Sequence, residues 1–149
     1  MHILGKKILF PPVETADENG LLAIGGDLSP ERLILAYKSG IFPWFNEGEP
    51  VIWYSPPERM VLFPKDLKVS KSMEKVLKNA NFRISFNEHF AEVIHHCKTI
   101  DRPGQKGTWI TRDMQKAYIA LHELGLAKSL EVWQEDRLVG GLYGIDLGH

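Results

Sequence analysis

A change of composition near Pro64 limits what this 149-residue chain can fold into more than any other feature. The residues before it are dense in proline, glycine and aromatic side chains, which is typical of short elements joined by turns. The residues after it carry longer helical and strand-like periodicities, each with its own cap. We therefore predict an N-terminal α+β domain over residues 1–64, followed by a second α+β domain over residues 65–149.

The N-terminal part contains one clear helix signal. Ser29 followed by Pro30 has the order of an N-cap and a first helical residue, and Gly40 supplies a stop. The spacing predicts a helix from Pro30 to about Ser39. The residues expected to be buried on it are Leu33, Ile34 and Tyr37.

Two β-prone runs follow that helix, at residues 51–54 and 60–63. Aromatic and β-branched residues are frequent in both runs, which favours strands. Pro56 and Pro57 lie between the runs and force a bend. We predict two short strands.

The second part begins with a helix, a strand and another helix. Ser70 and Asn87 stand where N-caps are preferred, and each precedes apolar residues at helical spacing. Between these helices, at residues 82–86, apolar and polar side chains alternate as in a half-buried strand. The apolar faces comprise Met73, Val76, Leu77 and Ala80 on the first helix, and Phe90, Val93, Ile94 and Cys97 on the second.

A third helix and a hairpin complete the pattern. Thr111 is expected to cap the helix, and Gly125 stands where a left-handed residue commonly ends one. Residues 129–134 and 138–144 are strand-like, and a tight turn between them predicts an antiparallel hairpin. The inward face of the third helix is expected to contain Met114, Ala117, Tyr118 and Leu121.

Charge and cysteine content exclude several classes of protein. The net charge is −1, so any RNA contact must come from a local basic patch. The single cysteine, Cys97, cannot form an internal disulfide, which fits a reducing cytoplasm. No apolar run approaches the ~20 residues that span a bilayer, so we predict a cytoplasmic protein without membrane contact. His95, His96 and Cys97 are spread around a helix instead of sharing one face, so no metal site is predicted.

Three lysines on the helix after Ser70 are the best candidate for a basic patch. Lys71, Lys75 and Lys78 recur at i, i+4 and i+7 and therefore share a face. A row of amines can follow a phosphate backbone. Such rows are often only solvated surface, however, and Glu74 weakens the local potential. Both interpretations stay open.

Four segments, in order along the chain, carry a family resemblance. They are Gly-Leu-Leu-Ala-Ile-Gly-Gly-Asp-Leu-Ser at 20–29, Gly-Ile-Phe-Pro-Trp-Phe at 40–45, Gly-Thr-Trp-Ile-Thr-Arg at 107–112 and Leu-Val-Gly-Gly-Leu-Tyr-Gly at 138–144. A weaker fifth is Trp-Tyr-Ser-Pro-Pro at 53–57. The second and third segments are unusually rich in aromatic residues, and the order and spacing of all of them match. The chain resembles the leucyl/phenylalanyl-tRNA–protein transferases.

This resemblance implies a fold and a reaction. The second domain is expected to have the acetyltransferase-like (GNAT) fold. The activity is expected to be transfer of Leu or Phe, and less readily Met, from aminoacyl-tRNA to proteins that begin with Lys or Arg, which marks them for the N-degron route of degradation. The implied partners are leucyl-tRNA, phenylalanyl-tRNA and those acceptor proteins. Because the aminoacyl ester is already activated, positioning is most of the task, and no cofactor or metal is expected.

The resemblance also implies binding residues. By it, Trp44, Trp109 and Tyr118 form an aminoacyl-adenosine site, and the three lysines contact tRNA. Aromatic faces suit both an adenine ring and an apolar side chain. The alternatives are that the rings near Trp44 fill a seam between domains and that Tyr118, with its helical spacing, is a core residue.

One departure from the family concerns length. Family members continue for several tens of residues beyond the last strand, through segments that finish the sheet, wall the side-chain pocket and supply the polar groups credited with catalysis. We therefore expect a truncated second domain, no catalytic residue within residues 1–149 and no transfer by this chain alone. Two alternatives are a non-catalytic tRNA-binding fragment and an acetyltransferase that uses acyl-coenzyme A, which the final hairpin also resembles.

Overall fold

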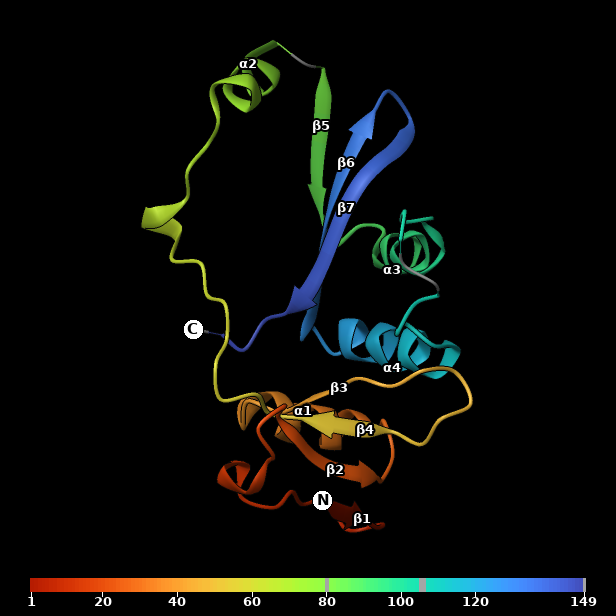
Figure 1. The fold of residues 1–149 in the computed structure, drawn as a ribbon. Coiled ribbons are helices and arrows are strands. Elements are labelled where there is room, and N and C mark those ends of the chain that lie inside the picture. The colour runs from red at the N-terminus through yellow and green to blue at the C-terminus, as the bar shows by residue number, and fades with distance from the viewer. Residues whose placement is uncertain (80, 105–106, 149) are drawn as a thin grey trace.

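Two separate β-sheets organise a mixed α+β chain. The computed structural model describes residues 1–79, 81–104 and 107–148. The first sheet contains, in spatial order, β1 (His2–Leu4), β2 (Leu21–Gly25), β4 (Ile52–Tyr54) and β3 (Phe42–Pro43). The second contains β5 (Phe82–Phe86), β6 (Ala127–Gln134) and β7 (Arg137–Ile145). The helices are α1 (Pro30–Lys38), α2 (Lys71–Asn79), α3 (Phe90–Thr99) and α4 (Arg112–Glu123). Figure 1 shows α4 between the two sheets.

The first sheet mixes parallel and antiparallel pairing. β1 runs parallel to β2, whereas β4 is antiparallel to both β2 and β3. Trp53 on β4 is fully buried, and its indole N–H donates to the carbonyl of Gly25 (2.9 Å). Phe10 packs edge-to-face on the same indole at 4.9 Å. The predicted strand at 51–54 is therefore confirmed and carries the centre of this core.

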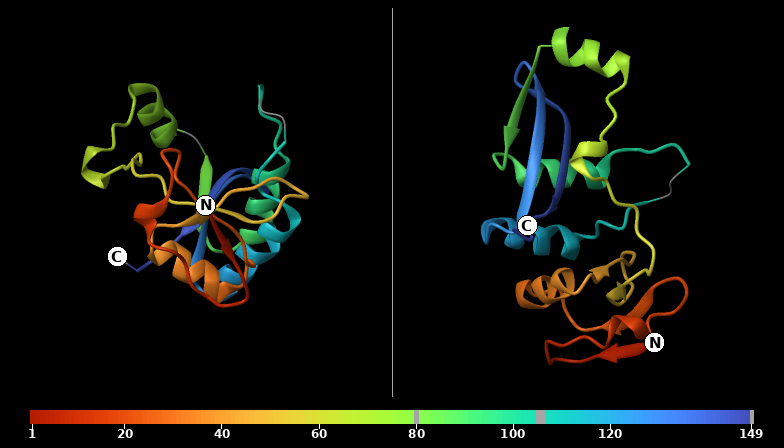
Figure 2. Two further views of the ribbon diagram at one scale, coloured as in Figure 1. Left: turned by 60° about the horizontal axis from the view of Figure 1, so that its bottom comes forward. Right: turned by 90° about the vertical axis from the view of Figure 1, so that its left-hand side faces the viewer.

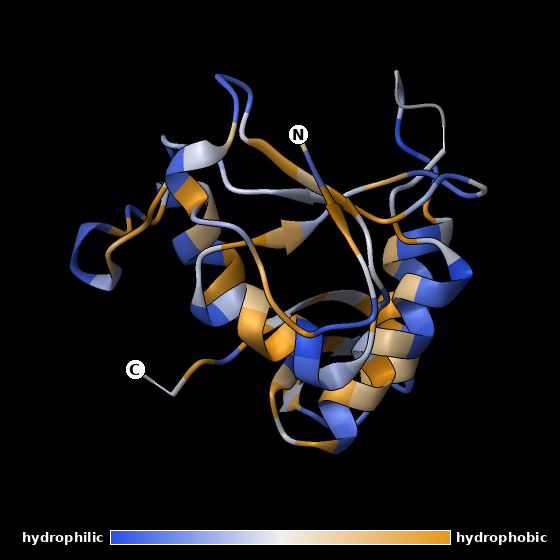
Figure 3. Cartoon of the chain, turned by 90° about the horizontal axis from the view of Figure 1, so that it is seen from below, coloured by the Kyte–Doolittle hydropathy of each residue, from blue (hydrophilic) through white to orange (hydrophobic). Residues whose placement is uncertain are grey.

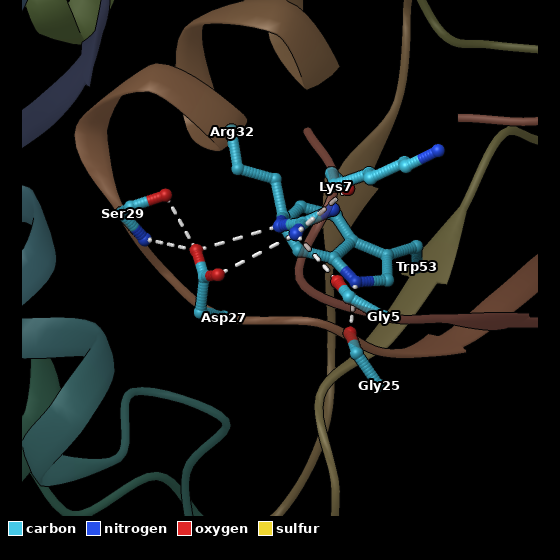
Figure 4. Close-up of polar contacts among 7 residues, drawn as sticks. All are labelled: Gly5, Lys7, Gly25, Asp27, Ser29, Arg32 and Trp53. Carbon is cyan, nitrogen blue, oxygen red and sulfur yellow. Dashed lines mark hydrogen bonds and ion pairs between the residues drawn. The ribbon is translucent and has the colours of Figure 1, made fainter. Parts of the chain in front are cut away.

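A buried arginine ties the first strand to α1 (Figure 4). Nη2 of Arg32 donates to the carbonyls of Gly5 (2.9 Å) and Lys7 (3.1 Å), and its Nε lies 3.4 Å from the Asp27 carboxylate. Ser29 donates to that same carboxylate through both its hydroxyl and its backbone N–H, and these bonds lower the pKa of Asp27. The helix begins as predicted, but the Ser29 hydroxyl does not cap it, because Asp27 takes the hydroxyl instead.

Helix α1 has the predicted extent to within one residue. Leu33 is fully buried, while Ile34 and Tyr37 are half-buried. Gly40 follows with a φ of 70° and sends the chain directly into β3. The helix therefore fixes where the aromatic segment at 42–45 starts.

Residues 60–79, which we call the outer arm, depart from expectation. The run at 60–63 is exposed and has no strand partner within the described part of the chain, so the predicted second strand is wrong. Ser70 does cap α2, since its hydroxyl accepts from the N–H of Met73 (3.2 Å). No residue of α2 is buried, however, because this helix stands apart at the end of the molecule opposite the N-terminus (Figure 1). The inward face predicted for it is therefore exposed, and Ala80 lies outside the described residues.

The second sheet is covered on one face by α3 and α4 (Figures 1 and 2). The covered face carries buried polar residues of β5 and β6 beside the apolar Ala127 and Trp133, whereas the other face carries exposed apolar residues. Along the helices, hydrophobic and hydrophilic residues alternate (Figure 3). Buried on the covered face are Ser85, Ser129, Glu131 and Trp133. Exposed on the other face are Phe82, Ile84, Phe86 and Leu142.

The helices beside this sheet follow the sequence closely. Thr111 caps α4, since its hydroxyl accepts from the N–H of Met114 (3.1 Å), and Gly125 is left-handed with a φ of 77°. Asn87 does not cap α3: its side-chain oxygen accepts from the N–H of Ser129 (2.9 Å), and the helix begins later, at Phe90. The buried residues of these helices are Phe90, Val93 and Ile94 on α3 and Met114, Tyr118 and Leu121 on α4.

The predicted hairpin is confirmed as β6 and β7, with Glu135 in the left-handed region at the turn. Gly141 on β7 lies directly beneath α3, because a Cβ added there would come within 3.1 Å of a Val93 methyl group. Gly141 therefore permits close helix–strand packing. Within the described residues, no helix is long and apolar enough to cross a bilayer.

Candidate functional site

Two indoles from distant parts of the chain share one cavity. Its volume is about 300 Å³, which is at the lower end of the range for small-ligand sites. The lining is mostly apolar and consists of Phe42, Pro43, Trp44 and Trp109. The cavity can therefore hold a flat or apolar group by stacking and burial.

Strand pairing holds Trp44 at the mouth of this cavity. Trp44 directly follows β3, and its backbone N–H donates to the carbonyl of Ile52 on β4 (2.8 Å). The indole is 54% exposed, whereas Phe45 beside it is buried. Phe45 belongs to the buried core, and Trp44 remains open to a ligand.

A tight turn before α4 places Trp109. The carbonyl of Trp109 accepts from the N–H of Thr111, the residue that caps the helix (3.0 Å). A second contact crosses from the other side of the cavity, where the Glu47 carboxylate accepts from the N–H of Arg112 (3.2 Å). This bond joins the β3–β4 loop to the start of α4 and so holds the two indole-bearing segments together.

Tyr118, the third predicted site residue, does not line this cavity. It is 3% exposed, and its hydroxyl is hydrogen-bonded to that of Tyr37 on α1. Its ring also meets Tyr143 of β7 edge-on at 5.7 Å. Tyr118 therefore lies at an aromatic junction between α1, α4 and the second sheet.

Burial determines the protonation of these phenols. It raises the pKa of Tyr37 and Tyr143, and it raises that of Tyr118 well above its usual value, with added repulsion from Tyr37. All three hydroxyls are consequently neutral at neutral pH and act as hydrogen-bonding groups. None of them is a ready base.

The predicted lysine row lies on the outer arm. Lys71, Lys75 and Lys78 are all exposed on α2, and Glu74 lies on the same helix. Helix α2, which carries these lysines, lies apart from β3, β4 and α4, which carry or adjoin the cavity-lining residues (Figure 1). The structure thus brings the two tryptophans together and leaves the lysines as a distinct surface.

Three further residues, which the sequence did not single out as site residues, contact the cavity or the predicted site residues. Phe42 lines it, Tyr54 contacts the Trp44 ring at 5.6 Å between centroids, and Tyr37 bonds to Tyr118. The strand register offered a signal for the first two, since Phe42 and Tyr54 are direct partners across β3 and β4. Nothing in the spacing of α1 indicated that Tyr37 would meet α4.

A larger cavity of about 510 Å³ lies elsewhere, between the end of α3 and β7. Cys97 is half-buried there, and burial raises the pKa of its thiol. The strand segment 138–141 forms one wall, and in the described chain β7 pairs only with β6. This cavity therefore follows the open edge of a sheet, and its thiol is not activated. Among the described residues, no cluster of His, Cys, Asp and Glu side chains is arranged to hold a metal.

Comparison with known proteins adds an independent finding. A family model described as leucyl/phenylalanyl-tRNA protein transferase matches residues 61–149, and the model of that family's N-terminal domain matches residues 26–57. A leucyl/phenylalanyl-tRNA–protein transferase of Flavobacterium johnsoniae is 62% identical over all 149 residues, which are 70% of that relative. One from Syntrophus aciditrophicus is 56% identical over 97% of the chain and 61% of the relative. One from Flavobacterium psychrophilum is 55% identical over 99% of the chain and 70% of the relative.

Proposed function

Because this chain belongs to the leucyl/phenylalanyl-tRNA–protein transferase family, we propose that it binds the aminoacyl end of leucyl- or phenylalanyl-tRNA in the cavity between Trp44 and Trp109. The reaction it serves is transfer of Leu or Phe, less readily Met, to proteins that begin with Lys or Arg. Acceptors so modified enter the N-degron route in the cytoplasm. The pair of indoles around one apolar cavity is the observation that carries this proposal.

The chemistry of the donor fits such a cavity. An aminoacyl ester needs no further activation, so the protein must mainly hold the terminal adenosine and exclude competing orientations. Indole faces bind a purine by stacking, and an apolar wall accepts a Leu or Phe side chain. The phenols of Tyr37 and Tyr118 are neutral, so they are suited to hydrogen bonding and not to proton abstraction.

Tyr118 is proposed as the third residue of this site. Its hydroxyl is held by Tyr37, so direct contact with the donor requires that the hydroxyl exchange this bond for one to the ligand. The exchange would couple donor binding to the contact between α1 and α4. Tyr37 is accordingly the partner whose removal would free Tyr118.

The chain spans 61–70% of the length of the three relatives above. We propose that the groups that promote attack by the acceptor amine belong to the part of those relatives that this chain does not span. The second sheet, with α3 and α4 on one face, is proposed to be the beginning of a GNAT-like domain. Donor binding is therefore the part of the activity to test on these residues.

The test is the affinity for a phenylalanyl-adenosine analogue with a non-hydrolysable amide in place of the ester. By calorimetry, Trp44→Ala and Trp109→Ala should each weaken binding about tenfold or more, because loss of a stacking ring costs about 1–3 kcal/mol. Phe86→Ala removes an exposed ring from the second sheet and is the matched control. Equal affinity in all four proteins would refute the proposal.

The lysine row is proposed to bind the tRNA body. Replacing Lys71, Lys75 and Lys78 with Glu should weaken tRNA binding and flatten its dependence on salt, because fewer counterions are released. The same protein should bind the adenosine analogue normally. Replacing Lys6 and Lys7, near the N-terminus, with Glu provides a control for the added negative charge. Unchanged tRNA affinity in the triple variant would remove the row from the proposal.

A further inference from the structure

Aromatic side chains beside the indole cavity form a row that ends in a cation. Trp44 lies 5.6 Å from Tyr54, Tyr54 lies 6.3 Å from Phe42 in a nearly parallel arrangement, and the guanidinium of Arg59 lies 5.5 Å from the centre of the Phe42 ring. We call these four residues the aromatic row. Trp44 and Phe42 also line the cavity, whereas Tyr54 and Arg59 do not.

Strand geometry places the row on one face of the β3–β4 pair. Phe42 and Tyr54 are register partners and therefore point to the same side, and Trp44 follows two residues after Phe42. The alternate residues, Pro43 and Trp53, point to the other side and are fully buried. One face of this short ribbon thus builds the core, while the other presents rings that are half-buried or exposed.

We propose that the aromatic row binds the two nucleotides that precede the terminal adenosine in the single-stranded 3′ end of the donor tRNA. This inference rests on the proposed function, because it requires the adenosine to lie between Trp44 and Trp109. Aromatic platforms with an adjoining arginine are a general solution for single-stranded RNA, since every base has a face that stacks. Tyr54 and Phe42 supply the ring faces, and Arg59 supplies the charge.

Charges around the row set the direction of the strand. Glu47 and Glu49 lie on the loop directly after Trp44, where their carboxylates oppose a phosphate. Arg59 lies at the opposite end and is exposed. The phosphates therefore run from the cavity toward Arg59. The outer arm begins at residue 60, directly after Arg59, and leads to the lysine row on α2.

A purely structural role would also produce such contacts, because cross-strand aromatic pairs stabilise short antiparallel ribbons. The two roles predict different effects of mutations in the row on the affinity for ligands of increasing length. A structural pair affects every ligand of the cavity alike. A stacking platform affects only ligands that carry the preceding nucleotides.

The experiment compares two non-hydrolysable ligands by calorimetry: phenylalanyl-adenosine and the phenylalanyl trinucleotide CCA. The trinucleotide should bind at least tenfold more tightly to the unaltered protein. Tyr54→Leu and Arg59→Gln should each reduce its affinity about fivefold or more and leave that of phenylalanyl-adenosine unchanged. Tyr54→Phe keeps the ring and should bind both ligands normally.

The outcomes separate this inference from the proposed function. If neither ligand binds, the proposed function fails. If both bind with equal affinity, the adenosine site stands and the aromatic row has no role in nucleotide binding. Equal losses for both ligands in Tyr54→Leu and Arg59→Gln would assign the row to supporting the cavity and would overturn the inference.

Discussion

The two faces of the second sheet differ in what they bury, although they are formed by alternate residues of the same strands. On the face against α3 and α4, the fully buried carboxylate of Glu131 accepts hydrogen bonds from the hydroxyls of Ser85 and Ser129 and from the N–H of His89. On the other face, Phe86 is 64% exposed. Polar groups are thus buried and satisfied where helices cover the sheet, while apolar groups lie uncovered opposite them.

The difference shows that burial in this sheet follows hydrogen bonding and helix contact as well as hydrophobicity. Ser85 accepts from the indole N–H of Trp133 (2.9 Å) while donating to Glu131, so the network joins β5 to β6. The Glu131 carboxylate also accepts from the backbone N–H of His89, and this bond holds the start of α3 against the sheet. The covered face supports the helices beside the candidate site, and the open face contributes little to that support.

The covered face should be the more sensitive to mutation. Glu131→Ala removes the acceptor of several buried donors, and we expect a loss of about 2–3 kcal/mol in the free energy of unfolding. Urea denaturation would measure it. A loss below about 0.5 kcal/mol would mean that the network is not stabilising.

A smaller loss is expected on α4, which packs against the same face. Tyr118→Phe keeps the ring and removes the hydroxyl that bonds to Tyr37, so stability should fall by about 1 kcal/mol. The double variant with Tyr37→Phe should cost little more, since neither hydroxyl is then left without its partner. Fully additive losses would show that the two hydroxyls do not interact.

The acid response should distinguish the network from simple burial. Burial tends to raise the pKa of Glu131, but the bonds from Ser129, Ser85 and backbone N–H groups outweigh it and lower the pKa below its ordinary value of 4.5. The stabilisation from ionised Glu131 is therefore complete above 4.5 and is lost as the pH falls through the lowered pKa. As the pH falls below 4.5, the free energy of unfolding of the unaltered protein should therefore decrease faster than that of Glu131→Gln. Parallel stability curves from neutral to about pH 3 would contradict the shift.

The open face should give the smallest effect. Phe86→Ser should change stability by no more than about 0.5 kcal/mol, because the side chain is mostly exposed. The same change should reduce self-association in light scattering, since it removes apolar surface. A large loss of stability would show that this face is covered in solution.

Local signals in the sequence predicted much of this fold. The caps at Ser70 and Thr111, the stop at Gly125 and the hairpin were confirmed because each depends on neighbouring residues. The alternation at residues 82–86 indicated a strand, but it could not show that the polar side would be covered. That outcome depends on Glu131, 46 residues after Ser85.

The exposed stripe of α2 and the absent strand at 60–63 have a similar cause. The apolar patterns of these segments predict burial, but a residue is buried only where another surface packs against it. Local spacing does not show whether such a surface exists. For the candidate site, the resemblance selected Trp44 and Trp109, and the structure brought them to one cavity. The pairing of Tyr118 with Tyr37 could not be predicted, because it joins residues 81 positions apart.

A crystal structure with the non-hydrolysable phenylalanyl-adenosine analogue bound would show directly whether the two indoles hold the donor. We expect the adenosine in the cavity lined by Trp44 and Trp109, with its base stacked on an indole. Density for the ligand in the α3–β7 cavity instead, with the two indoles unoccupied, would contradict this expectation.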